Sequence, residues 1–168
     1  SARRIQKLIR LEGLEHYKAA AAQGSVIMLA PHFLSLDYAG IRHTIDYSGA
    51  SMYSAQRIGA FDSLLLRART RFNDPRLIAR HEGIRPCIRA LKDGLNFYYL
   101  PDQDLGPRES IFAPFFGINT ATVPALSRLT QLSNARVVPM VAEMGWFGFT
   151  LRYYPVWENF PGESVEAD

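Results

Sequence analysis

The chain has 168 residues, of which 48% are hydrophobic and 21% are charged, and 19 basic against 16 acidic residues give a net charge of +3. This length allows one ordinary hydrophobic core and is too short for two, so we expect a single domain. The mild charge gives no reason to expect a nucleic-acid partner, and the single cysteine excludes an intrachain disulfide. Sixteen of the basic residues are Arg, whose guanidinium matches phosphate and carboxylate groups with two hydrogen bonds, so an anionic ligand is expected.

The first elements are a helix and a buried strand. Apolar residues recur at near-helical spacing among basic side chains over residues 5–18, which predicts one amphipathic helix that Gly24 ends. Its cationic face fits an anionic lipid surface, or equally a solvated helix that covers the sheet. The apolar run over residues 26–30 is typical of a buried strand, and a second helix is expected from near Ser35.

Short strands and helices continue to alternate through the middle of the chain. Residues 51–53 and 76–79 have the pattern of short strands, and a helix over about 62–71 separates them. A further helix over about 83–93 leads into an aromatic strand over 96–100.

The last third of the chain opens with a stretch that carries no charge, residues 110–127, which prolines and a glycine interrupt, so we expect no transmembrane segment here. A helix over about 124–134 and strands over 137–142 and 147–156 follow. Strands that alternate with helices predict an α/β sandwich with a largely parallel or mixed central sheet flanked by helices. In such folds, binding sites gather beyond the carboxyl ends of the strands.

His32 and Asp37 are the first candidate site. Their spacing of five residues allows a hydrogen bond if the histidine lies in a loop and the aspartate in the helical turn that follows. The carboxylate would then fix the imidazole tautomer, and the other ring nitrogen could take a proton from a hydroxyl group. A half-exposed histidine and a helix-capping aspartate explain the same spacing without any chemistry. Arg80, at the end of a predicted strand, is likewise either a surface residue or a ligand-binding one.

A polar loop over residues 101–108 forms the second candidate site, with a phenylalanine-rich segment over 112–117 after it. Charged and apolar surfaces side by side suit a ligand with an anionic head and an acyl tail. Alternatively, the loop is a solvated turn whose arginine pairs with its own aspartates, or Asp102 and Asp104 bind a divalent cation. Asp102, like His32, follows the carboxyl end of a predicted strand.

Four sequence blocks, in order, resemble the late acyltransferases of lipid A biosynthesis, the lauroyl/myristoyl branch of the lysophospholipid acyltransferase superfamily. The H-x-x-x-x-D/E signature of the superfamily looks like residues 32–37, and its second block looks like Leu77-Ile-Ala-Arg80. The third block is similar to Asp102-Gln-Asp-Leu-Gly-Pro-Arg108, in the form typical of the lipid A branch, with residues 110–117 after it. The fourth is similar to Val137-Val-Pro139, so the resemblance covers nearly all of the chain.

The resemblance implies transfer of a fatty acyl group from an acyl-carrier-protein thioester to a hydroxyl of a lipid A precursor, without a cofactor or a metal. His32 would be the general base and Asp37 the residue that orients it, although many lipid A enzymes carry Glu at this position. The residues implied to bind the acceptor are Arg80, Asp102, Asp104, Gly106 and Arg108.

The resemblance also implies a place on the membrane surface, at the cytoplasmic face of a bacterial inner membrane. Residues 1–168 would be a single acyltransferase domain, a fragment without the family's hydrophobic amino-terminal anchor and carboxyl-terminal helical section. Three alternatives stay open: a glycerophospholipid or aminolipid acceptor, a non-catalytic lipid-binding domain, and a cation-dependent glycosyl or phosphoryl transferase.

Overall fold

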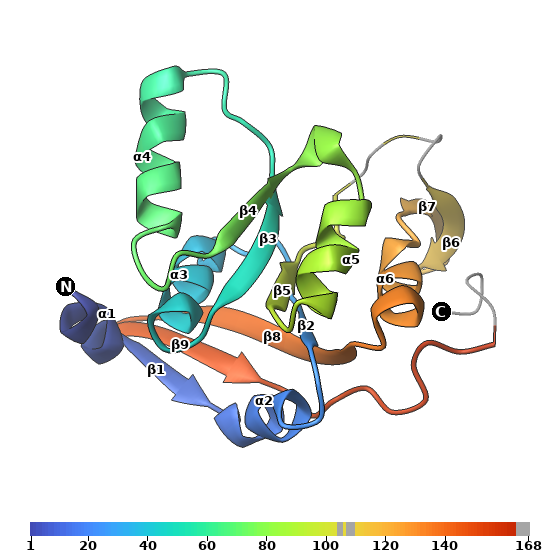
Figure 1. The fold of residues 1–168 in the computed structure, drawn as a ribbon, viewed down its shortest axis with the longest axis horizontal. Helices are drawn as coiled ribbons and strands as arrows, with labels where there is room; N and C mark the ends of the chain where they lie inside the picture. The colour runs from blue at the N-terminus through green and yellow to red at the C-terminus, as the bar shows by residue number, and fades with distance from the viewer. Residues whose placement is uncertain (104–105, 107–109, 164–168) are drawn as a thin grey trace.

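The computed structural model describes residues 1–103, 106 and 110–163, in which helices and strands alternate along the chain (Figure 1). Within this part of the chain, no helix is long and apolar enough to cross a lipid bilayer. The elements, in order, are α1 (Ala2–Leu8), β1 (Ile9–Glu12), α2 (Leu14–Ala21), β2 (Val26–Leu29), α3 (Leu36–Asp46), β3 (Gly49–Tyr53), α4 (Gly59–Arg69), β4 (Arg76–Ala79), the 3-10 helix η1 (Arg80–Glu82), α5 (Arg85–Lys92), β5 (Asn96–Tyr99), β6 (Ile111–Phe115), β7 (Ile118–Thr122), α6 (Ala125–Ser133), β8 (Arg136–Gly145) and β9 (Gly148–Tyr153).

Seven of the strands form one sheet in the order β1-β9-β8-β2-β5-β3-β4, and β6 pairs with β7 in a separate hairpin. Along the sheet from β8 through β2, β5 and β3 to β4, neighbouring strands are parallel. Strand β9 is antiparallel to β8, and β1 pairs in parallel with the other side of β9. The predicted α/β class, with a largely parallel or mixed sheet flanked by helices, is therefore confirmed.

Two apolar clusters cover the two faces of the sheet. Because side chains alternate along a strand, Val26 and Met28 of β2 join the cluster under α2 and α3, while Ile27 joins the cluster under α5 and α6. Figure 1 shows α2 on one side of the sheet and α5 on the other. Cys87 of α5 is fully buried in the second cluster, and burial raises the pKa of its thiol to about 11, as expected for a structural cysteine.

The prediction of one helix over residues 5–18 is wrong. The segment forms α1, then β1, then α2, because β1 pairs with β9, a strand about 140 residues away in sequence. Gly13 makes the turn between β1 and α2 with a φ of +66°, and a Cβ there would lie 2.1 Å from the carbonyl oxygen of Tyr153. A non-local strand pairing has overridden a local helical pattern.

The β6–β7 hairpin is an element that the sequence analysis did not predict. Its turn is Phe116-Gly117, and both residues have positive φ, 48° and 80°, as a two-residue hairpin turn requires. The usual sequence signal of such a turn is Asn-Gly or Asp-Gly, and it is absent here. Phe-Gly gives no comparable signal, because a phenylalanine at a positive φ is uncommon.

Buried His43 of α3 has consequences for stability. It is 2% exposed, packs among tyrosine rings, and has its Nδ1 atom 3.0 Å from the hydroxyl of Tyr153. Among the described residues, its Nε2 atom has no hydrogen-bond partner. Burial therefore lowers the pKa of His43 from 6.5 to about 4, with Asp46 opposing the shift and Arg42 adding to it.

We expect stability to fall as the pH decreases from about 6.5 to 4, because the unfolded chain then binds a proton that the folded chain rejects. The contribution of His43 to the free energy of unfolding should be complete above pH 6.5. As the pH falls to 4, the protein should lose roughly 3 kcal/mol of this free energy through His43. Urea unfolding at a series of pH values measures the slope. His43→Gln has no group that titrates here, so its profile should be flatter; an unchanged slope would assign the effect to other residues.

Candidate active site

His32 and Asp102 follow two neighbouring parallel strands at equivalent positions. In the pairing of β2 with β5, Leu29 lies opposite Tyr99, and His32 and Asp102 each come three residues later. The N–H of Ala30 donates to the carbonyl oxygen of Tyr99 at 2.9 Å, which keeps the two chain segments side by side beyond the strands. The strand register therefore brings a histidine and a carboxylate together at the carboxyl edge of the sheet.

Both oxygens of the Asp102 carboxylate bind His32. Oδ1 lies 2.5 Å from the ring Nδ1, and Oδ2 accepts a hydrogen bond of 2.7 Å from the backbone N–H of His32. Partial burial alone would raise the pKa of Asp102, but these hydrogen bonds outweigh it and hold the pKa below its ordinary value. An ionised carboxylate accepts a hydrogen bond from Nδ1–H, so the neutral imidazole carries its lone pair on Nε2.

Asp37 lies in the first turn of α3, as expected, but its carboxylate contacts a different partner. Oδ1 accepts a hydrogen bond of 2.8 Å from Nε of Arg69, in the last turn of α4. The expected hydrogen bond from His32 to Asp37 is thus absent from the described residues, where Asp102 occupies Nδ1 instead. The reason is geometric: α3 packs against α4, so Asp37 faces Arg69, whereas the register of β2 and β5 places Asp102 on the histidine.

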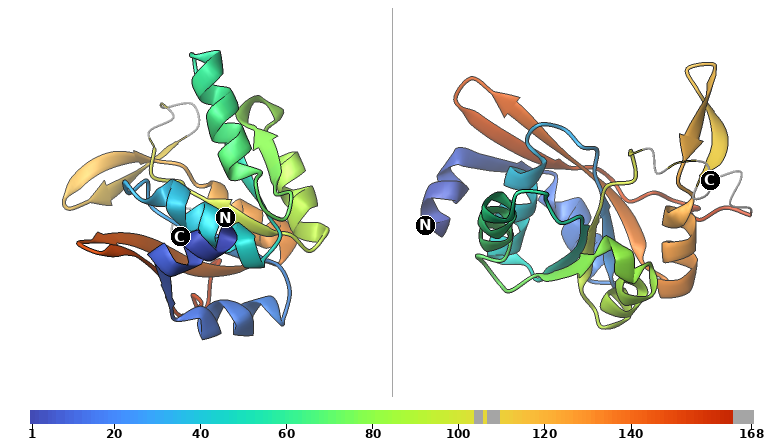
Figure 2. Two further views of the ribbon diagram at one scale, coloured as in Figure 1. Left: turned by 90° about the vertical axis from the view of Figure 1, so that its left-hand side faces the viewer. Right: turned by 90° about the horizontal axis from the view of Figure 1, so that it is seen from above.

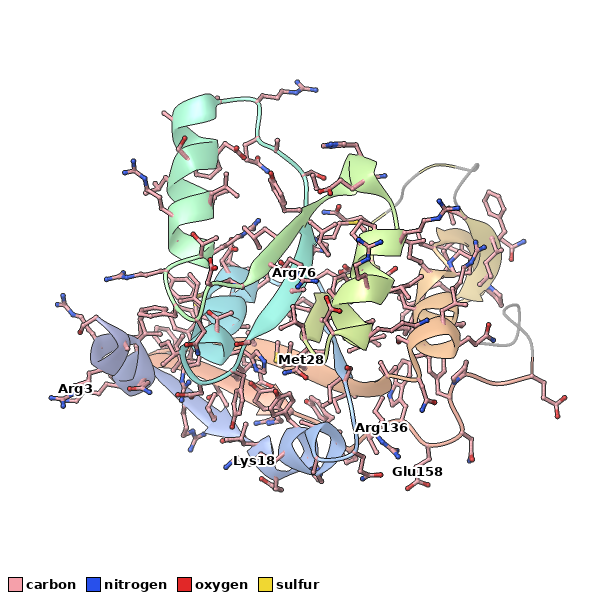
Figure 3. All side chains as sticks on the ribbon, in the orientation of Figure 1. Arg3, Lys18, Met28, Arg76, Arg136 and Glu158 are labelled. Atoms are coloured by element: carbon pink, nitrogen blue, oxygen red, sulfur yellow. The ribbon has the colours of Figure 1, made fainter. Side chains whose placement is uncertain are left out.

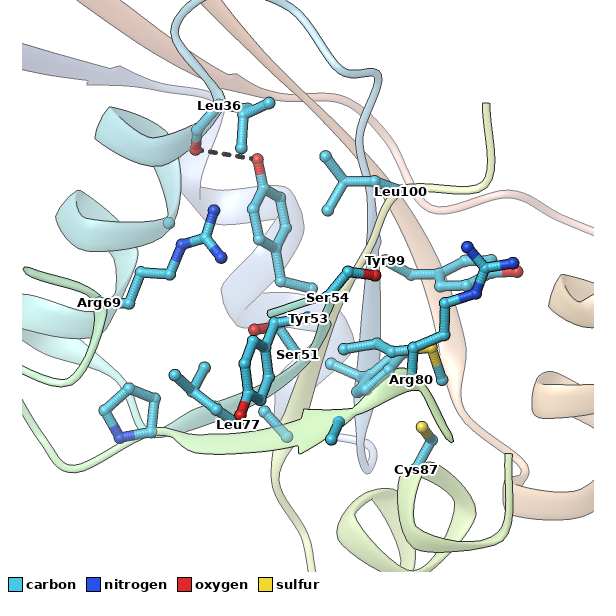
Figure 4. A pocket seen from close by; sticks show the side chains of 18 of the residues that line it. Leu36, Ser51, Tyr53, Ser54, Arg69, Leu77, Arg80, Cys87, Tyr99 and Leu100 are labelled. Carbon is cyan, nitrogen blue, oxygen red and sulfur yellow. Dashed lines mark hydrogen bonds between the residues drawn. The ribbon is translucent and has the colours of Figure 1, made fainter. Parts of the chain in front are cut away.

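Tyr98 of β5 lies near both carboxylates. Its hydroxyl donates to the carbonyl oxygen of Leu36 at 3.2 Å, the bond drawn in Figure 4. Burial raises the pKa of this hydroxyl well above its ordinary value, and the charges of Asp37 and Asp102 add to the shift while Arg69 opposes it. Tyr98 therefore stays protonated and fixes the start of α3 to the sheet.

A cavity of about 1000 Å³ extends from these residues over the sheet. His32, Asp37, Arg69 and Arg80 line it, and Figure 4 shows the two arginines on opposite sides of it. Much of the remaining lining is apolar and comes from the strands and helices beneath, including Met28, Met52, Leu77, Phe97 and Leu129. Guanidinium groups beside an apolar interior suit an amphiphilic ligand with an anionic head.

The structure brings His32, Asp37, Asp102 and Arg80 of the predicted site to one place. Arg80 directly follows β4, is exposed, and has no ion pair with any residue that the structure describes. Gly106 has a φ of +83°, in the region that favours glycine. Asp104 and Arg108 lie outside the described residues.

The alternative of a divalent cation at Asp102 and Asp104 competes with contacts that Asp102 already makes. Asp102 already has both carboxylate oxygens on His32, and Asp104 is not among the described residues. Elsewhere in the described ranges, no group of three or more His, Cys, Asp and Glu side chains lies close enough together to hold a metal ion.

Sequence reasoning missed two residues of the site, Arg69 and Tyr98. Arg69 falls inside a correctly predicted helix, but nothing in the spacing relates it to Asp37, 32 residues earlier. The role of Asp102 beside His32 had a signal, because both residues follow predicted strands. The missing information was that β2 and β5 are neighbours, with two other strands between them in sequence.

Comparison with known proteins matches residues 1–167 to the family model described as bacterial lipid A biosynthesis acyltransferase. The chain is 39% identical to a lipid A biosynthesis acyltransferase of Haemophilus influenzae, over 99% of the chain and 54% of that protein. It is 38% identical to the lipid A biosynthesis myristoyltransferase of Escherichia coli, over 82% of the chain and 43% of that protein. It is 32% identical to the palmitoleoyltransferase of the same organism, over 98% of the chain and 54% of that protein.

The chain spans about half the length of the curated relatives it matches. The family match covers almost every residue of the chain, including the His32–Asp37 signature and the Asp102 loop. The resemblance to the family is therefore confirmed, and the chain belongs to the bacterial lipid A biosynthesis acyltransferase family.

Proposed function

We propose that the protein transfers a fatty acyl group from an acyl-carrier-protein thioester to a hydroxyl group of a lipid A precursor. The observation that carries this proposal is the His32–Asp102 pair at an apolar cavity flanked by arginines. Membership of the family supports the reaction class. We further propose that residues 1–168 act as one acyltransferase domain, at the cytoplasmic face of the bacterial inner membrane.

In the proposed reaction, His32 acts as general base through Nε2. It takes the proton of the acceptor hydroxyl while the oxygen attacks the thioester carbonyl carbon. The resulting tetrahedral intermediate collapses as the carbon–sulfur bond breaks, and the imidazolium returns its proton to the leaving sulfur. The Asp102 carboxylate, 2.5 Å from Nδ1, stabilises the imidazolium between these steps.

Asp37 supports the site in this proposal through Arg69 rather than through the histidine. The ion pair holds Arg69 at one side of the cavity, opposite Arg80 (Figure 4). Both guanidinium groups would then bind phosphate groups of the acceptor. Asp104, Gly106 and Arg108 remain proposed acceptor-binding residues by their place in the third sequence block.

The test supplies the full-length protein with a panel of acyl-carrier-protein thioesters and lipid acceptors and identifies products by mass. We expect one added acyl group on a lipid A precursor and an unchanged rate in the presence of a chelator. Acylation of a glycerophospholipid or aminolipid instead would reassign the acceptor. Lipid binding without turnover of any thioester would identify a lipid-binding domain and contradict the proposal.

A further inference from the structure

The β8–β9 hairpin projects far beyond the edge of the sheet that carries His32. Strand β8 is parallel to β2, with Pro139 opposite Leu29, and it continues to Gly145, six residues later. At roughly 3.3 Å per residue, the hairpin reaches about 20 Å past the end of β2. Its turn consists of Trp146 and Phe147, which are fully exposed, at 99% and 101%.

Two further apolar segments lie on the same side. Both views in Figure 2 show the β6–β7 hairpin and the β8–β9 hairpin projecting in one direction. Phe116, at the turn of β6–β7, is 92% exposed, and Phe115 beside it is also exposed. Phe33 and Leu34, next to His32 in the sequence, are exposed as well. We call these segments the apolar rim: Phe33, Leu34, Phe115, Phe116, Trp146 and Phe147.

Basic residues accompany the rim. The carboxyl end of α1 touches the β8–β9 hairpin, since a Cβ on Gly148 would lie 2.6 Å from the carbonyl oxygen of Leu8. Lys7, in the last turn of α1, and Arg3 and Arg4 before it are exposed, and Figure 3 shows Arg3 projecting outward from the helix. Aromatic tips next to cationic side chains have the composition of an interface with anionic lipid.

The shape of the rim favours a bilayer over a protein partner. A stable protein interface buries about 800 Å² on each side over a closely fitting surface, whereas the rim consists of separate projections around a site. Projections can enter a soft lipid interface one by one. We propose that the apolar rim inserts into the surface of an anionic bilayer, with α1 at the headgroups, so that the His32 site opens toward the membrane. This inference takes only one element from the proposed function, namely that the acceptor is a lipid.

The two tryptophans of the chain provide a test, because they lie at opposite ends of the β8–β9 pair. Trp146 is at the tip, whereas the backbone N–H of Trp157 donates to the carbonyl oxygen of Val137 at the start of β8. Trp157→Phe leaves Trp146 as the reporter, and Trp146→Phe leaves Trp157. With the 168-residue chain and vesicles of phosphatidylglycerol and phosphatidylethanolamine, we expect a blue shift and quenching by brominated lipid only for Trp146. Pure phosphatidylcholine vesicles should give a weaker response.

Binding measurements complete the test. Trp146→Ser with Phe147→Ser should weaken vesicle binding by about tenfold or more, whereas Leu132→Ser, at a similarly apolar exposed position on α6, should leave it unchanged. Equal responses of both tryptophans, or undiminished binding by the tip variant, would overturn the inference. So would a dimer in solution that the tip variant dissociates. The vesicle assay contains no acyl donor and is therefore independent of the acyl-transfer assay. A protein that binds vesicles but transfers no acyl group would contradict only the proposed function. A protein that transfers acyl groups but does not bind vesicles would contradict only the proposed insertion of the apolar rim.

Discussion

His32→Ala is expected to abolish acyl transfer and to leave the fold intact. Without Nε2 no group at this position can accept the proton of the attacking hydroxyl, and the rate should fall by at least about 1,000-fold. The fold should survive because the His32 side chain lines the cavity and is partly exposed, and its ring is bound only by Asp102 among the described residues.

The measurement is the initial rate with the thioester and acceptor found active for the wild-type protein, together with circular dichroism and the midpoint of thermal unfolding. His16→Ala, on α2 and away from the cavity, is the matched control and should keep the wild-type rate. Transfer at a near normal rate by His32→Ala would rule out the proposed mechanism.

The part of the site that sequence could predict is the part that local structure determines. The apolar run before His32 predicts a strand, and the residues after it predict a helix, so a loop histidine and a helical Asp37 follow directly. The expected hydrogen bond between them did not follow, because five residues of separation allow the contact without requiring it. Which carboxylate reaches Nδ1 depends on the neighbours of each strand and helix.

The same distinction explains the fold. Most strands and helices were predicted near their observed positions because their patterns are local. The segment at residues 9–12 was predicted as helix and is strand β1, since its partner β9 lies at the other end of the chain. The contact of Asp102 with His32 was not predicted, because it depends on strand β5 lying next to β2 in the sheet. Errors thus occur where a distant segment decides the structure.

Asp102→Asn and Asp37→Asn should separate the roles of the two carboxylates. In Asp102→Asn the new side chain has no charge to stabilise the imidazolium, and its amide can donate to Nδ1 and so favour the tautomer with the proton on Nε2, the wrong atom for a base. We expect kcat to fall by about 100-fold or more with KM little changed. Asp37→Asn keeps Asp102 on the histidine and loosens Arg69, so KM for the acceptor should rise more than kcat falls.

Steady-state kinetics on both variants, with varied acceptor, provide the comparison. Arg69→Gln serves as the matched control, because it removes the other half of the Asp37 ion pair and should reproduce the rise in KM. A larger loss of kcat in Asp37→Asn than in Asp102→Asn would mean that Asp37 orients His32 during catalysis, as the five-residue signature first suggested. We expect the larger loss of kcat in Asp102→Asn, because the register of β2 and β5 already holds Asp102 on His32 before substrate binds. Asp37 then acts on the acceptor indirectly, by holding Arg69.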